Sequence, residues 1–166
     1  MSLRTFLSGG FIDRQSWRRV DSQLIEQKLD SAQARFVLTF ESGCLIESQS
    51  ALLLKRTDIE ALITPETSIY LGSSGTHELF VIDLPDESTA PAGLADSAAS
   101  FRGILGELSE HDAALLAYAK GMVEWRRRHK FCGNCGAPTR PINGGTLLEC
   151  SATDCDARSF PRLDPA

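Results

Sequence analysis

The chain has 166 residues, of which 42% are apolar and 23% charged, values that are typical of globular proteins and exclude a fibre or a disordered chain. No apolar run approaches the roughly 20 residues that a membrane-spanning helix needs, and residues 1–14 lack the long apolar core of a secretory signal. We therefore expect a soluble cytoplasmic protein with no membrane partner. The net charge of −5 disfavours a protein that coats nucleic acid.

Charge and cysteine content divide the chain into two parts. Residues 1–119 contain 9 basic and 17 acidic residues, whereas residues 120–166 contain 8 basic and 5 acidic residues. Cys44 is alone in the first part, and the other four cysteines lie in the second. This change of sign predicts two units with different surfaces.

Short apolar runs predict a strand-rich first unit. Strands are expected at residues 35–40, 44–47, 51–54, 69–71 and 78–84. Short connections between them favour an antiparallel or mixed sheet over alternating strands and helices. Thr57 is expected to cap a helical turn at 58–63. Residues 85–100, rich in Pro, Ala, Ser and Asp, are predicted to form an exposed loop or linker.

The strongest helix prediction begins after Ser109. A serine at this position, with Asp112 three residues later, is typical of a helix N-terminus. Apolar residues then recur at helical spacing through Val123. The basic run at 126–128 falls in the last turn, where it complements the helix dipole. Two interpretations of this run stay open: a solvated helix end, or a ligand or phosphate contact.

Four cysteines in two pairs predict a metal site. Cys132 and Cys135 are separated by two residues, and Cys150 and Cys155 by four, spacings that let each pair turn back on one zinc ion. Gly144 lies in a predicted turn between the pairs, and a strand at 146–150 follows, as in a zinc ribbon. Four thiolates leave no open coordination position, so the zinc is expected to be structural. Lys130, Arg140 and Arg158 are candidates to offset its negative charge.

Two other roles for the cysteines compete with zinc. A redox pair would require a thioredoxin-like strand–helix–strand context, which the sequence does not show. Disulfides suit secreted chains, for which no signal is present. Cys44 lies in a strand pattern and is expected to be a small buried apolar residue.

The second part of the chain resembles a known family. The run AALLAYAKGMVEWRRRHKFCGNCGAP (113–138) is similar to the linker helix and zinc ribbon of the NADH pyrophosphatases of the Nudix superfamily, and SFPRLDPA (159–166) is similar to the segment that leads into their catalytic domain. LFVIDL (79–84) resembles the end of their N-terminal domain more loosely. The pair at 150 and 155 differs from the two-residue spacing usual in the family.

The resemblance implies an α+β fold: an N-terminal Nudix-like domain with a small mixed or antiparallel sheet (1–107), a linker helix (108–130) and a zinc ribbon (131–163). Residues 164–166 would begin the segment leading to the catalytic domain. The resemblance carries over the zinc ligands Cys132, Cys135, Cys150 and Cys155. The Nudix box, whose carboxylates bind Mg²⁺ or Mn²⁺, does not occur in this sequence, which therefore offers no candidate catalytic residue.

Two functions follow as hypotheses. The first is the dimerising, structural part of a homodimeric enzyme that hydrolyses the pyrophosphate of NADH or NAD⁺ to nicotinamide mononucleotide and AMP. Relatives in the family also remove NAD caps from RNA, which makes NAD-capped RNA a further candidate substrate. This part is expected to be inactive alone. The alternative is a stand-alone zinc-ribbon module that binds protein or nucleic acid, with Trp125, the basic run 126–128 and Lys130 as a basic-aromatic patch.

Overall fold

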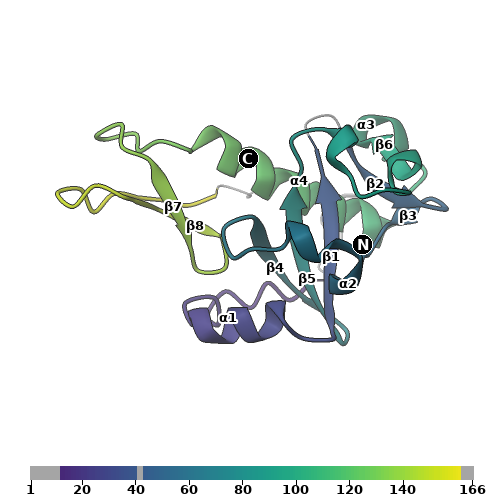
Figure 1. Ribbon diagram of the computed structural model, residues 1–166, viewed down its shortest axis with the longest axis horizontal. Coiled ribbons are helices and arrows are strands. Elements are labelled where there is room, and N and C mark those ends of the chain that lie inside the picture. Colours follow the sequence, from purple (N-terminus) through teal and green to yellow (C-terminus); the bar gives the residue numbers. More distant parts are fainter. Residues whose placement is uncertain (1–11, 41–42, 162–166) are drawn as a thin grey trace, which may run out of the picture.

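The first part of the chain forms a mixed sheet with helices on both faces, and a smaller three-stranded sheet follows (Figure 1). The computed structural model describes residues 12–40 and 43–161. The expected segment at 164–166 lies outside these ranges. Among the described residues, no helix is long and apolar enough to cross a membrane.

The main sheet has the strand order β3-β2-β1-β5-β4, with β6 paired to β2. Its strands are Ala34–Thr39 (β1), Gly43–Glu47 (β2), Ser50–Ala51 (β3), Ser68–Ser74 (β4), His77–Asp83 (β5) and Ala98–Ser100 (β6). β1 and β5 run parallel, whereas the other neighbours are antiparallel. The predicted α+β class with a mixed sheet is therefore confirmed.

Four α-helices and three short 3₁₀ turns complete the described fold. The helices are Ser22–Leu29 (α1), Arg56–Ile59 (α2), Phe101–Ile104 (α3) and Glu110–Arg128 (α4). The 3₁₀ turns are Glu60–Leu62 (η1), Glu87–Thr89 (η2) and Ala95–Ser97 (η3). The α1 helix is not among the elements predicted above, although Asp21 caps it by accepting the Leu24 backbone N–H at 3.1 Å.

Alternating side chains of the central strands build a core on each face of the sheet. Val37 and Val81 point into the cluster that contains the buried face of α4. Phe36 and Phe80 point to the other face, where they stack with ring centroids 5.5 Å apart beside residues of α1. Because a strand has a side-chain period of two, both faces of β1 and β5 must be apolar to support these two layers.

Three local predictions differ from the structure. Thr57 does not cap the helical turn: α2 begins earlier, and the Asp58 carboxylate accepts the Lys55 backbone N–H at 2.8 Å. The strand expected at 51–54 is shorter, and beyond β3 only Leu54 bridges to β1. The segment 85–100 is not entirely loop, because its last three residues pair with β2 as β6.

The α4 helix begins where the sequence predicts. Ser109 accepts the Asp112 backbone N–H at 3.1 Å through its hydroxyl, which satisfies one of the donors that the first turn leaves free. The buried side of the helix then covers one face of the sheet and includes Leu115, Ala119 and Met122. This burial supplies the apolar contact that holds the helix on the sheet.

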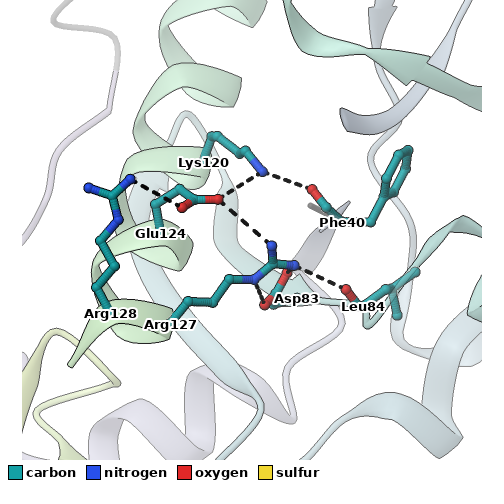
Figure 2. Close-up of polar contacts among 7 residues, drawn as sticks. All are labelled: Phe40, Asp83, Leu84, Lys120, Glu124, Arg127 and Arg128. Carbon is teal, nitrogen blue, oxygen red and sulfur yellow. Dashed lines mark hydrogen bonds and ion pairs between the residues drawn. The ribbon is translucent and has the colours of Figure 1, made fainter. Parts of the chain in front are cut away.

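The C-terminal half of α4 is tied to the sheet by a polar network (Figure 2). Arg127 donates from Nε and Nη2 to the two carboxylate oxygens of Asp83, both at 2.6 Å, and from Nη2 to the Leu84 carbonyl at 3.3 Å. Two turns earlier, Lys120 donates to the Phe40 carbonyl at 2.9 Å. The bidentate pair fixes both the position and the direction of the helix end.

Replacing Arg127 by alanine is expected to lower the free energy of unfolding by about 1–2 kcal/mol, because the pair is partly buried and its loss leaves Asp83 without its two donors. Arg128→Ala is the matched control: its side chain is 78% exposed and lies 3.9 Å from Glu124. The control should change stability by less than about 0.5 kcal/mol. Urea denaturation measures both, and equal effects would contradict the anchoring role of Arg127.

Candidate metal centre

The second sheet is the predicted ribbon. It consists of Thr139–Ile142 (β7), Leu147–Cys150 (β8) and Arg158–Ser159 (β9), all antiparallel in the order β7-β8-β9. Residues 143–145 form the tip between β7 and β8 with positive φ angles of 52°, 65° and 80°. The Asn-Gly-Gly sequence allows this turn, because asparagine and glycine adopt left-handed backbone more readily than other residues.

The four predicted ligand residues converge at the far end of the ribbon. The sulfur atoms of Cys132 and Cys155 lie 3.8 Å apart, and those of Cys135 and Cys150 lie 3.4 Å apart. All four ligand atoms fall within 4.8 Å of one another. A tetrahedral zinc site with Zn–S bonds of about 2.3 Å would place its sulfurs about 3.8 Å apart. The observed spacing therefore fits one zinc ion.

Backbone hydrogen bonds hold each cysteine pair in a tight turn. In the first turn the Gly136 N–H donates to the Cys132 carbonyl at 2.9 Å, and the Asn134 N–H points to the Cys132 sulfur at 3.4 Å. In the second turn the Ala152 N–H lies 3.5 Å from the Cys150 sulfur. Backbone donors from Cys135 and Asn134 lower the pKa of the Cys132 thiol to about 7. These N–H groups favour the Cys132 thiolate, which is the form that binds metal. Backbone hydrogen bonds act in the same direction at Cys150 and Cys155, but burial and hydrogen bonds with neighbouring thiols outweigh them and raise the pKa of both.

The cysteine cluster could hold a structural metal and is not built for catalysis. Within the described residues, it is the one group of three or more Cys, His, Asp or Glu side chains whose ligand atoms converge in this way. Four sulfurs would fill a tetrahedral zinc and leave no position for a water molecule. No carboxylate cluster for Mg²⁺ or Mn²⁺ accompanies it in the described part of the chain.

Two of the cations expected to offset the thiolates have another role. Arg140 and Arg158 both pair with Glu149 in the middle of the ribbon, at 2.6 and 3.0 Å. Hydrogen bonds from these two guanidinium groups hold the pKa of Glu149 below its usual range. The three side chains thus form a cross-strand ladder over β7, β8 and β9.

The ribbon is docked on the main sheet through its tip and through β8. The Tyr70 backbone N–H, on the edge strand β4, donates to the Gly144 carbonyl at 2.8 Å. A Cβ atom at Gly144 would lie 3.1 Å from the Tyr70 Cβ, so glycine permits this close approach. Leu148 is buried in the same apolar cluster as the inner face of α4.

The remaining sequence candidates take structural places. Cys44 is 2% exposed in the core, and burial raises its pKa to about 11, as expected for a small buried apolar residue. Trp125 is only 7% exposed, so it offers no stacking surface. Within the basic run, Arg127 binds Asp83 and Arg126 donates to the Glu66 carbonyl. The basic-aromatic patch of the alternative hypothesis therefore lacks its aromatic member.

Two family models match adjacent segments of this chain. The rudimentary NUDIX domain of NADH pyrophosphatase-like proteins matches residues 33–125, and the NADH pyrophosphatase zinc ribbon domain matches residues 127–160. The two matches occur in the order of the main sheet and the ribbon, with the boundary at the end of α4.

Individual relatives agree with the family models. The NAD-capped RNA hydrolase NudC of Pseudomonas putida is 30% identical over 131 residues, which cover 75% of this chain and 43% of that protein. NudC of Deinococcus radiodurans is 35% identical over 98 residues, 59% of this chain and 33% of that protein. The NAD-capped RNA hydrolase of Schizosaccharomyces pombe is 30% identical over 107 residues, which cover 54% of this chain and 28% of that protein. The chain thus spans less than half the length of these curated relatives.

Replacing Gly144 by alanine tests the docking of the ribbon tip. Gly75→Ala is the matched control, because the two glycines have similar φ angles, 58° at Gly75 and 65° at Gly144. A Cβ atom added at Gly75 would meet nothing within 4 Å, whereas one added at Gly144 would face Tyr70. Both variants should lose about 1 kcal/mol for left-handed alanine, and Gly144→Ala about 1 kcal/mol more for the crowded contact. Hydrogen exchange of the Tyr70 amide should accelerate only in Gly144→Ala, and unchanged exchange would contradict the docking.

Proposed function

The chain belongs to the NADH pyrophosphatase family that joins a rudimentary NUDIX domain to a zinc ribbon, and from this we propose that it is the structural part of an NAD(H) diphosphatase. Such an enzyme hydrolyses the pyrophosphate of NADH or NAD⁺ to nicotinamide mononucleotide and AMP. The names of the relatives extend the proposed substrates to NAD-capped RNA. The observation that carries the proposal is the adjacent match of two domains from the same kind of enzyme.

We propose that this part holds Zn²⁺ through Cys132, Cys135, Cys150 and Cys155. The sulfur spacing and the family match support this set. When bound, zinc supplies a closed tetrahedral centre that links the two cysteine turns. The ribbon buries few apolar residues of its own beyond Leu147 and Leu148, so much of its folding free energy would come from the metal. A cytoplasmic location belongs to the proposal, because reducing conditions keep thiols available for zinc.

Catalysis is assigned in this proposal to residues outside this chain. Divalent Mg²⁺ or Mn²⁺, held by the carboxylates of a Nudix box, would neutralise the pyrophosphate and activate water there. The main sheet, α4 and the ribbon would support that catalytic part and contribute to a homodimer, as the family resemblance implies. The position of the ribbon is set by α4 and by the tip contact with Tyr70.

Elemental analysis should find one zinc per chain, and Cys150→Ser should lose most of it, because three thiolates bind zinc far more weakly than four. Cys44→Ala is the control: its thiol lies in the core, outside the cluster, and the variant should retain one zinc. Hydrogen exchange should rise at 131–160 in Cys150→Ser while β1 and β5 stay protected. A Cys150→Ser chain with full zinc content would disprove the ligand set.

The purified 166-residue chain should not hydrolyse NADH with Mg²⁺ or Mn²⁺, because no carboxylate cluster is available among the described residues to hold these ions. Release of AMP is measured by chromatography, with the Pseudomonas putida relative assayed in parallel as the positive control. Turnover by the pure chain that survives repeated purification would overturn the assignment of a non-catalytic role.

A further inference from the structure

A cleft of about 640 Å³ opens where the main sheet, the C-terminal end of α4 and the ribbon meet. We call it the junction cleft. It is lined from the sheet side by Ile69 and Asp83, from α4 by Arg126 and Arg127, and from the ribbon side partly by Leu148. Its volume lies in the range of small-molecule sites. Because all three units contribute to it, a ligand bound there would contact each of them.

The charged groups of the junction cleft are unequal in number. Its lining includes the cations Arg126, Arg127 and Lys130, but the one carboxylate among the described lining residues is that of Asp83. Both oxygens of Asp83 accept hydrogen bonds from Arg127, so these two charges offset each other. Arg126 and Lys130 therefore give the lining an excess of positive charge.

Arg126 and Lys130 are differently placed toward an anion. Arg126 donates from Nη2 to the backbone carbonyl of Glu66, which is a neutral acceptor and uses one of its five N–H groups. Burial holds the pKa of Arg126 below its usual range, although the negative charges of Asp83 and Glu66 act in the opposite direction and raise it. Lys130 is exposed, and no hydrogen bond or ion pair joins its ammonium to the described residues. Both retain donors for an added ligand.

The partial negative charge at the C-terminal end of α4 offsets the charge of these cations only in part. The helix dipole places about half a negative charge at a C-terminus. Arg126 and Lys130 together outweigh this half charge, although the Glu66 carboxylate near Arg126 offsets part of the excess. A phosphate dianion placed between Arg126 and Lys130 would receive charge-assisted hydrogen bonds, which are about twice as strong as neutral ones.

Apolar walls stand beside the cations. Ile69, Val123 and Leu148 line the cleft together with Pro85 and Pro141. A ligand that fits this surface has an anionic end and a body with an apolar face, such as a nucleobase offers. We propose that the junction cleft binds a nucleoside monophosphate, with the phosphate between Arg126 and Lys130 and the base against the apolar wall. This site goes beyond the proposed function, since it requires no hydrolysis and no Nudix box.

Calorimetric titration of the zinc-loaded chain with AMP tests the site. Saturable binding with a Kd below about 1 mM is expected. Arg126→Ala and Lys130→Ala should each weaken it by about 10-fold, the value of one charge-assisted contact. Arg128→Ala is the matched control on the same helix turn. Figure 2 shows Arg128 extending away from Asp83, and its change should leave the Kd within about twofold.

Two further titrations define the ligand class. Adenosine, which lacks the phosphate, should not bind measurably, and inorganic phosphate should bind at least about 10-fold more weakly than AMP. Absence of AMP binding, or equal losses in Arg126→Ala and Arg128→Ala, would overturn the site. Inorganic phosphate binding as tightly as AMP would overturn the role of the apolar wall.

Lys130 is exposed, so its variant separates lost binding from lost folding. None of these readouts depends on NADH hydrolysis, so the site and the proposed function can fail independently.

Discussion

The ion pair between Arg127 and Asp83 determines where α4 ends relative to the main sheet, and the ribbon follows directly from that end. Asp83 is the last residue of β5, which pairs with β1 on one side and β4 on the other, so the pair connects the helix to an interior strand of the sheet. The first zinc-ligand candidate, Cys132, comes only a few residues later along the chain. An error in the position of the helix end would therefore displace the entire ribbon.

A second constraint arises because the ribbon is too small to be stable through its own apolar core. Two features compensate for this: four sulfurs gathered at one end and a docked tip at the other. Leu148 joins the two, since β8 carries both this buried side chain and Cys150. The proposed metal would thus stabilise the ribbon locally, whereas Gly144 and Leu148 orient it on the sheet.

Local signals in the sequence predicted much of the site. The cysteine spacing identified all four sulfurs that converge, and Ser109 located the start of α4, because caps and ligand turns depend on residues close together in sequence. The parallel pairing of β1 with β5 and the bond from Tyr70 to Gly144 join residues far apart in the chain. Sequence spacing carries no information on such contacts, so they could not be predicted. The basic run at 126–128 could not be interpreted from the sequence either, because such charge suits both a helix end and a ligand site. The structure shows that Arg127 pairs with Asp83, whereas Arg126 lines the junction cleft.

We propose that the four thiolates converge on one zinc ion and close the ribbon. X-ray absorption at the zinc edge of the purified chain measures this directly, because it reports the number and type of ligand atoms. The expected result is four sulfur ligands at about 2.3 Å and no oxygen or nitrogen ligand. A shell with fewer than four sulfurs, completed by nitrogen or oxygen at about 2.0–2.1 Å, would contradict it.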